Sequence, residues 1–491
     1  MAKFRNLILQ KIMPRSSEEE ETAAESPFIP AHDGVHGTSR GVALSRRVAR
    51  NGAPNGSRSA RDVDPTIGLN VEFKPTMLPE HAMEMLVNHA VNAGASDLFM
   101  TCNEDCMDVS VRHLGIVKKI AELPSELGFL CINHVRAVSG LKFHEKRRPQ
   151  DGRWIYRRPD GEVTVDLRLN TMPTLYGESV AMRLLVRDSQ LQELENLGMV
   201  GPQLGTLLGM LHSPSGLILV TGPTGSGKTT SLYACLHFLN DGRRKIHTIE
   251  DPVEYAVHGL CQTQANEEHG AGFAELLRGI VRQGTDVMMI SEIRDRPTAE
   301  VAVRAANSGQ LVFATLHASV AAAAVQSMLG LGVPSQFLAS SLLAVISQRL
   351  VRTLNPNTRV PVDLSMAPRT FEEVQNWLEP GQGKVVYTAG EQAEGNEGYQ
   401  GRTGVFELMT MSPKLRELIN EMAPAAVIHE QFLAEGMLDF QRAAMLKVAE
   451  GVTSFDEMHR SLPTVDEWAW ASVRPQTVPQ NGHPMPVPYD V

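Results

Sequence analysis

The chain has 491 residues, which predicts two to four domains, because single hydrophobic cores rarely keep growing beyond roughly 250 to 300 residues. Its formal net charge of −10 leaves no basic excess, which argues against a nucleic acid as a direct partner. Five cysteines without metal-ligand spacing favour a reduced, cytosolic compartment. The sequence has no run of about 18 apolar residues, so we expect no membrane span.

The two ends of the chain differ in composition from its middle. Residues 1–74 contain an acidic run and a stretch rich in Arg, Gly, Ser and Pro, which predicts a disordered segment. Its opening, "MAKFRNLILQKIM", places apolar residues at helical spacing between basic ones; a frayed segment and a helix that docks on a membrane surface or a partner are both compatible with it. Residues 464–491 are Pro-rich and predict an extended, disordered tail.

The middle of the chain changes character twice. Residues 75–190 begin with a helical pattern and continue with alternating strands, which predicts an α+β subdomain with an antiparallel sheet. In residues 195–353, the short apolar runs "GLILVTG", "KIHTIED", "DVMMISE" and "QLVFATLH" are separated by segments long enough for crossover helices. This alternation predicts an α/β domain with a mainly parallel sheet buried on both faces. Residues 399–463 predict a mostly helical C-terminal subdomain, in which "SPKLRELINEM" begins with a Ser-Pro helix start.

A phosphate-binding loop follows the first of these strands. "GPTGSGKTT" matches G-x-x-x-x-G-K-[ST], and its glycines allow backbone N–H groups to surround a phosphate at the start of the next helix. Lys228 would neutralise the β and γ phosphates, and the Thr229 hydroxyl would hold Mg²⁺. The predicted binding residues are Gly222, Thr224, Gly225, Ser226, Gly227, Lys228, Thr229 and Thr230.

Polar side chains end three other predicted strands. A nucleoside triphosphatase needs an acid near the phosphate-binding loop, and Glu292 emerges at the carboxyl end of "DVMMISE", where α/β sheets bind ligands. Glu250 and His317 end their strands in the same manner. Each could also be a solvated or structural residue, but their occurrence on three strands after a phosphate-binding loop favours catalysis.

These motifs resemble, in order, the four boxes of the bacterial ATPases of type II secretion and type IV pilus assembly. "GPTGSGKTT" is similar to the Walker A box, "TIEDPVEY" to the Asp box, "LLRGIVRQGTDVMMISEIRD" to Walker B and "GQLVFATLHAS" to the His box. The resemblance covers about residues 80–462. Within it, "SQRLVRTL" and "GYQGRTGVFELM" are typical of the assembly and export branch rather than of retraction motors.

The resemblance implies a RecA-like P-loop core, a PAS-like N-terminal subdomain and a hexamer that hydrolyses Mg-ATP. It also implies that Arg153, Arg168 and Arg183 approach the phosphates. Arginine side chains at such positions stabilise the negative charge of a phosphoryl group during its transfer. From the residues alone, Arg168 and Arg183 could equally be surface residues of a sheet. Glu292 would activate water and help to hold Mg²⁺. The implied partners are a polytopic inner-membrane platform protein and a membrane-associated docking subunit, which places the chain in the cytoplasm beside the inner membrane.

The sequence departs from the family at the zinc site. Export ATPases of this family carry four cysteines, and the corresponding positions here are Asn355, Thr358, Glu391 and Glu394. Without thiolates we expect no zinc, so residues 354–398 are predicted to be a degenerate zinc-site insertion.

Smaller departures surround the predicted active strand, where the family's "DPD", "GE" and "HTN" are replaced by "GTD", Ser291-Glu292 and "HAS". The leading hypothesis is a motor that powers pilus or pseudopilus assembly or protein export. A weakly hydrolysing regulatory or scaffold subunit of such a machine, or a motor for DNA uptake, is the alternative.

Overall fold

A computed structural model describes the protein over residues 67–69, 71–158, 164–186, 192–266, 272–367, 369–390 and 398–463. Of the two terminal segments predicted to be disordered, 464–491 lies outside the described residues, as does nearly all of 1–74. Within the described part, no helix is both long enough and apolar enough to cross a bilayer.

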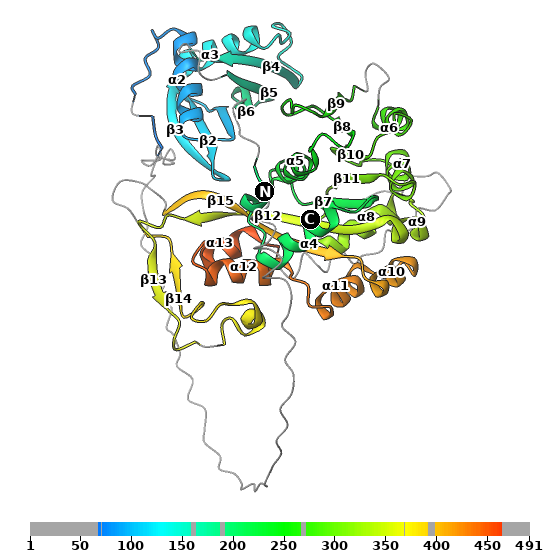
Figure 1. Ribbon diagram of the computed structural model, residues 1–491. Helices are drawn as coiled ribbons and strands as arrows, with labels where there is room; N and C mark the ends of the chain where they lie inside the picture. Colours follow the sequence, from blue (N-terminus) through cyan, green and yellow to red (C-terminus); the bar gives the residue numbers. More distant parts are fainter. Residues whose placement is uncertain are drawn as a thin grey trace, which may run out of the picture. The chain divides into compact units, whose positions relative to one another are not determined.

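The first part of the described chain is a six-stranded antiparallel sheet with two helices, drawn in blue and cyan in Figure 1. The strand order is β3-β2-β1-β6-β5-β4, and apolar side chains from both helices and the sheet form one buried core. This agrees with the predicted antiparallel sheet. The elements are α2 (Pro79–Asn92), β1 (Asp97–Cys102), β2 (Cys106–His113), β3 (Ile116–Pro124), α3 (Ser125–Val138), β4 (Gln150–Arg157), β5 (Thr164–Thr174) and β6 (Gly177–Val186).

A second sheet of seven strands has the order β15-β12-β7-β11-β10-β8-β9. All neighbours in it are parallel except β15, which runs antiparallel to β12. The parallel sheet predicted from the four apolar runs is therefore confirmed. The strands are β7 (Gly216–Thr221), β8 (Ile246–Glu250), β9 (Cys261–Gln264), β10 (Val287–Ile290), β11 (Leu311–Leu316), β12 (Leu342–Leu354) and β15 (Tyr399–Thr410).

Helices cover both faces of this sheet, which explains why its central strands are buried throughout and mainly apolar in β7, β10 and β11. One face packs against η1 (Leu194–Leu197), α4 (Gly201–Leu211) and α5 (Lys228–Leu239). The other face packs against α6 (Phe273–Val281), α7 (Arg296–Asn307), α8 (Ala321–Gly330), α9 (Ser335–Ser341), α10 (Pro413–Asn420) and α11 (Ala425–Ala434). The fold is a RecA-like α/β core.

The sequence pattern does not predict strand β15, because residues 399–463 are expected to be mostly helical. Strand β15 pairs with β12 over almost its whole length, although 44 residues separate the two strands (399 minus 355). Between them lie a small antiparallel sheet, β13 (Val360–Asp363) with β14 (Val385–Thr388), and η3 (Glu372–Trp377). Of the four positions that correspond to zinc ligands in the family, Glu391 and Glu394 lie outside the described residues.

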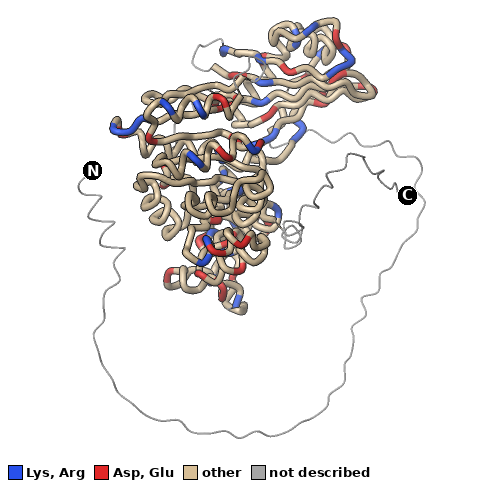
Figure 2. Tube along the Cα trace, turned by 90° about the vertical axis from the view of Figure 1, so that its right-hand side faces the viewer, with Lys and Arg blue, Asp and Glu red and all other residues tan. Residues whose placement is uncertain are grey.

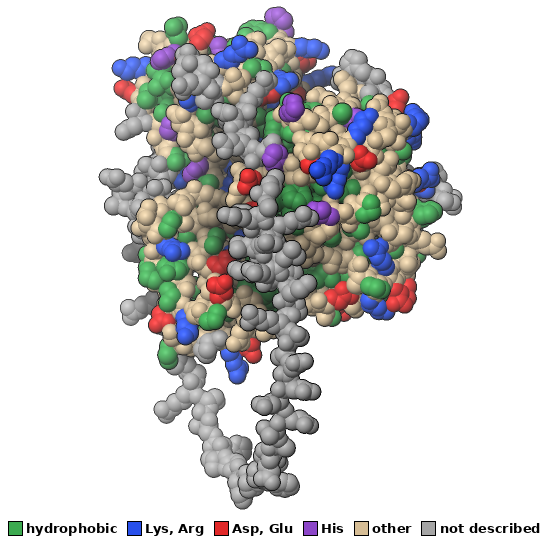
Figure 3. All heavy atoms as spheres, in the orientation of Figure 1, with side chains coloured by type: hydrophobic (Ala, Val, Ile, Leu, Met, Phe, Trp, Pro, Cys, Tyr) green, Lys and Arg blue, Asp and Glu red, His purple; other side chains and the backbone are tan. Residues whose placement is uncertain are grey.

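The C-terminal helices follow β15. Ser412 caps α10 by accepting a hydrogen bond from Leu415 N, as the Ser-Pro start predicts. Helices α12 (Phe440–Ala449) and α13 (Phe455–Ser461) pack against β15 and β12 and are drawn in orange and red in Figure 1. Basic and acidic positions are interspersed along the trace in Figure 2 and over the described residues on the face shown in Figure 3.

A fully buried glutamate joins the sheet to these helices. Glu407 on β15 accepts hydrogen bonds from Ala321 N at 2.9 Å and Phe440 N at 3.3 Å. Burial, more than the nearby Asp439, raises the pKa of its carboxyl to about 8. The folded protein therefore keeps the Glu407 proton to a higher pH than the unfolded chain does.

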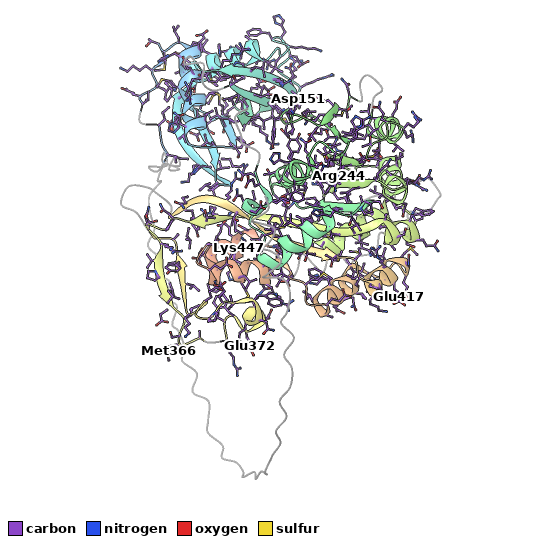
Figure 4. All side chains as sticks on the ribbon, viewed as in Figure 1. Asp151, Arg244, Met366, Glu372, Glu417 and Lys447 are labelled. Atoms are coloured by element: carbon purple, nitrogen blue, oxygen red, sulfur yellow. The ribbon has the colours of Figure 1, made fainter. Side chains whose placement is uncertain are left out.

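Because the pKa of Glu407 is raised, its contribution to stability is fully present below about pH 4.5 and is lost as pH rises toward about 8. We expect Glu407→Gln, which cannot ionise, to reduce the loss of unfolding free energy between pH 5 and pH 8 by a few kcal/mol. Urea unfolding at both pH values measures this. Glu417→Gln, at an exposed position on α10 labelled in Figure 4, is the matched control. Equal pH dependence in the parent and Glu407→Gln would contradict the expectation.

Candidate functional site

The predicted phosphate-binding loop joins β7 to α5 at the carboxyl edge of the second sheet. Gly222 has φ 144°, and a Cβ there would lie 2.5 Å from Gln348 O on the neighbouring strand, so no larger residue fits. Gly227, with φ 89°, precedes the first residue of α5. Gln348 Nε2 also donates to Ser226 O at 2.6 Å, which holds the loop against β12. The backbone is thus arranged to receive an anion at the N-terminus of α5.

Lys228 is the first residue of α5 and turns back over this loop. Its Nζ donates to Gly222 O at 2.8 Å and to Pro223 O at 3.1 Å. Burial lowers the pKa of its ammonium group, Arg349 lowers it further and Glu292 opposes both. Thr229 and Thr230 follow on exposed positions in the first turn of α5. Lys228, Thr229 and the loop backbone thus lie together at the start of α5.

Glu292 lies two residues after the end of β10 and interacts with Arg294 and His317. Its carboxylate lies 2.7 Å from Arg294 Nη2 and 3.0 Å from His317 Nε2 at the end of β11. Burial raises the pKa of Glu292, but Arg294 and His317 together outweigh burial and hold it below its ordinary value. The carboxylate is therefore ionised at neutral pH. Glu292 and His317 are in contact. Lys228 lies close enough to Glu292 for the carboxylate to raise the pKa of its ammonium group.

Glu250 lies deeper, at the end of β8, with only 1% of its surface exposed. It accepts hydrogen bonds from the Tyr233 hydroxyl, from Thr248 Oγ1 at 2.6 Å and from Gln262 Nε2 at 3.2 Å. These donors hold its carboxyl inside the protein. The next residue, Asp251, is half-exposed and lies 3.7 Å from Arg294. Asp251 and Arg294 are thus neighbours of Glu292 that the sequence interpretation missed, although "TIEDPVEY" and "SEIRD" contain them.

Of the departures from the family around β10, the "GTD" segment has a structural explanation. Thr285, in "GTD", is buried and contacts His247 Nδ1 at 3.0 Å and Ile280 O at 3.1 Å. Asp286 accepts from Lys245 N at 2.7 Å, at the amino end of the strands and far from the loop. At the carboxyl end, Ser291 O accepts a hydrogen bond from Thr315 Oγ1. Among the described residues, Ser291 Oγ has no hydrogen-bond partner.

The three predicted N-terminal arginines form one row across the first sheet. Arg153 pairs with Arg168 in the strand register, and Arg168 pairs with Arg183. Because neighbours in register point to the same side, all three lie on the face opposite the buried core. Arg153 forms an ion pair with Asp166 (Nε to Oδ1 2.8 Å), and Arg183 with Asp97 (Nε to Oδ1 3.3 Å).

Of the three arginines, Arg168 contacts the loop that follows β8 of the seven-stranded sheet. Its Nη2 lies 3.7 Å from Glu254 Oε2, in the loop after β8. Burial raises the pKa of Glu254, while Arg168 lowers it. None of the three arginines is hydrogen-bonded to the phosphate-binding loop within the described residues.

A second group of arginines, which the sequence interpretation missed, lies beside this loop. A cavity of about 260 Å³ is lined by Thr224 to Ser226 on one side and by four arginines on the other, namely Arg349, Arg352, Arg402 and Arg460. Arg352 and Arg460 both bind Glu457, at 2.9 Å and 2.6 Å. Arg402 is exposed and has no hydrogen-bond acceptor among the described residues, and partial desolvation by the surrounding protein lowers its pKa. The signal was present in "SQRLVRTL" and "GYQGRTG", but nothing in the sequence shows that these segments meet.

Taken together, the loop, Lys228 and the four arginines form a positively charged edge that suits a polyphosphate. Glu292 adds an ionised carboxylate next to His317. Thr229 and Glu292 also offer hard oxygen donors of the kind that Mg²⁺ prefers.

Comparison with known proteins yields one family. The model of the "Type II/IV secretion system protein" family matches residues 76–460. The "Type II secretion system protein E" of Aeromonas hydrophila is 38% identical over 375 residues, covering 76% of this chain and 74% of that protein. The "Type IV pilus assembly ATPase PilB" of Pseudomonas aeruginosa is 37% identical over 372 residues, covering 76% and 65% of the two chains.

Two solved structures share the fold. The Legionella pneumophila ATPase DotB superposes with a TM-score of 0.58 at 18% identity, over 79% of this chain and 96% of that one. The pilus retraction motor PilT with bound ADP gives a TM-score of 0.51 at 23% identity, over 78% and 98%.

The position of Arg402 generates a binding prediction. We expect Arg402→Gln to weaken the binding of ADP by about tenfold to hundredfold, because one charge-assisted hydrogen bond contributes about 1.5 to 3 kcal/mol. Isothermal titration calorimetry measures the affinity. Arg416→Gln is the control, since burial also lowers the pKa of Arg416, which lies on α10 outside this cavity. Equal affinities for Arg402→Gln and the parent would contradict the prediction.

Proposed function

Because this chain belongs to the Type II/IV secretion system protein family, whose relatives are named as secretion and pilus assembly ATPases, we propose that it is a hexameric motor. The motor hydrolyses Mg-ATP to power the assembly of pilin or pseudopilin fibres, or protein export, at the inner membrane. It works from the cytoplasm with a polytopic platform protein and a membrane-associated docking subunit.

The convergence of Lys228, Glu292 and His317 at one edge of the sheet is the observation that carries this proposal. Lys228 exchanges its bonds to Gly222 O and Pro223 O for phosphate oxygens of ATP. Glu292 accepts a proton from the attacking water, and His317, 3.0 Å away, orients that carboxylate. Thr229, with Glu292 nearby, would hold Mg²⁺, which would supply positive charge to offset that of the phosphates.

Glu250 supports the site in this proposal rather than touching the phosphate. Its buried hydrogen bonds to Tyr233, Thr248 and Gln262 fix the end of β8. Asp251, the next residue, thereby stays beside Arg294, which contacts Glu292. Glu250 acts through these neighbours, so we assign it a positioning role.

The arginine row supplies positive charge from the N-terminal subdomain. Arg168 already contacts Glu254, and Arg153 and Arg183 are its neighbours in register. In the proposed motor, nucleotide binding and hydrolysis change the angle between the N-terminal subdomain and the core, and the row then approaches or leaves the phosphates. This movement, coordinated around a ring, does the mechanical work.

Substitutions at the loop and the acid test the catalytic assignment. We expect Lys228→Ala to abolish ATP turnover by removing charge from the phosphate site, and Glu292→Gln to abolish turnover while ATP binding persists. Phosphate release measures turnover, and calorimetry measures binding. Glu300→Gln, at a partly exposed acid of α7 that pairs with Arg296, is the matched control. Unchanged turnover in Glu292→Gln would overturn its role. Binding without turnover in the parent would instead favour the regulatory subunit.

The arginine row and the ring are tested together. We expect Arg168→Gln to lower kcat by about 10³-fold, the lower range for an arginine that stabilises phosphoryl transfer, and to leave a hexamer that forms with ATP. Phosphate release and analytical ultracentrifugation measure the two properties. Arg157→Gln, an exposed position on β4, is the control. A monomer in saturating ATP would contradict the ring, and normal kcat in Arg168→Gln would contradict the role of the row.

A further inference from the structure

A cleft with no role in the proposed chemistry lies among the C-terminal helices. It encloses about 570 Å³ between the starts of α8, α11 and α12 and the end of α13. Its apolar wall includes Val320, Ala322, Phe440 and Met458, which are all buried residues. An apolar cleft of this size fits one or two large side chains.

The polar groups of the cleft lie beside this apolar wall. Glu430 and Asp439 are acceptors, and burial, with a further effect of Arg442, lowers the pKa of His429 to about 4, so that it is neutral. A guest that suits the cleft is therefore mainly apolar and carries a hydrogen-bond donor for a carboxylate. An indole ring has these properties, because its body is apolar and its N–H only donates.

The chain itself leaves the C-terminal helices through this cleft. Leu462 and Pro463 line it, and residues 464–491 lie outside the described residues. That segment begins "TVDEWAWASV", so two of the protein's four tryptophans, Trp468 and Trp470, follow within seven residues. Five residues of extended chain reach about 17 Å, which lets Trp468 reach any part of a cleft of this size.

We propose that residues 464–491 dock in this cleft of their own chain through Trp468 and Trp470. The tether favours this occupant over a second copy, because a short linker gives an effective concentration in the millimolar range. Val320, on the wall, follows His317 by three residues, so the docked segment contacts the loop that carries His317. The docking itself does not depend on the proposed function.

Tryptophan fluorescence tests this docking in the full-length chain. Replacing Trp154 and Trp377 by Phe leaves emission from Trp468 and Trp470 alone. We expect this emission to be shifted to the blue, and its quenching by acrylamide to be several-fold weaker, relative to a free peptide of residues 464–491. In the same background, Ala426→Glu places a charge in the cleft and should return both properties to those of the peptide.

Ala434→Glu is the matched control, because Ala434 is exposed on the same helix but outside the cleft. It should keep the blue-shifted emission. Emission like that of the peptide in the parent background would overturn the proposal, as would equal effects of Ala426→Glu and Ala434→Glu. A blue shift that disappears on dilution would also overturn it, since it would identify a second copy as the occupant. Circular dichroism of each variant establishes that it is folded.

Discussion

The parallel alignment of β7, β8, β10 and β11 is the constraint on which the site depends. Parallel strands bring all their carboxyl ends to one edge, so segments separated by tens of residues deliver their side chains to a common place. The phosphate-binding loop leaves β7, and His317 leaves β11 beside it. Glu292 leaves β10, one strand further. A change of strand order would separate these groups, whatever their individual chemistry.

Much of this arrangement could be predicted from the sequence. The four strands are short, wholly buried runs because helices cover both faces of the sheet, and in β7, β10 and β11 these runs are mainly apolar, which is visible without an alignment. The loop pattern could be recognised because backbone geometry demands glycine at Gly222 and Gly227. The antiparallel N-terminal sheet could be predicted from alternating residues such as Leu167, Arg168 and Leu169, where only one face is buried.

Features that arise from distant contacts could not be predicted. Strand β15 was placed in a helical segment because its pairing with β12 depends on the fold and not on its own pattern. The burial of Glu250 depends on Tyr233, which α5 supplies from another layer. The arginine cavity joins Arg349 on β12 to Arg402 on β15 and Arg460 on α13, and spacing along the chain does not reveal that they meet. The predicted roles of the terminal segments and of Glu391 and Glu394 stay predictions.

The second property of the site is the pairing of charges that keeps Glu292 ionised although it is partly buried. Glu292 remains ionised in a partly buried position because Arg294 and His317 offset its desolvation. Around the phosphate-binding loop, positive charge predominates instead. Lys228 and Arg402 are partly desolvated cations, and desolvation lowers their pKa values. An anionic polyphosphate would relieve the repulsion among these cations, while the ionised carboxylate of Glu292 stays available as an acceptor. This separation of charge is what an ATP-hydrolysing site requires.

A structure of the Glu292→Gln protein with ATP and Mg²⁺, determined by electron cryo-microscopy, tests the assignment of this site most directly. We expect the triphosphate inside the loop from Gly222 to Thr229, with the γ-phosphate within hydrogen-bond distance of Lys228 Nζ and next to residue 292. A triphosphate bound with its γ-phosphate away from both Lys228 and residue 292 would contradict the assignment.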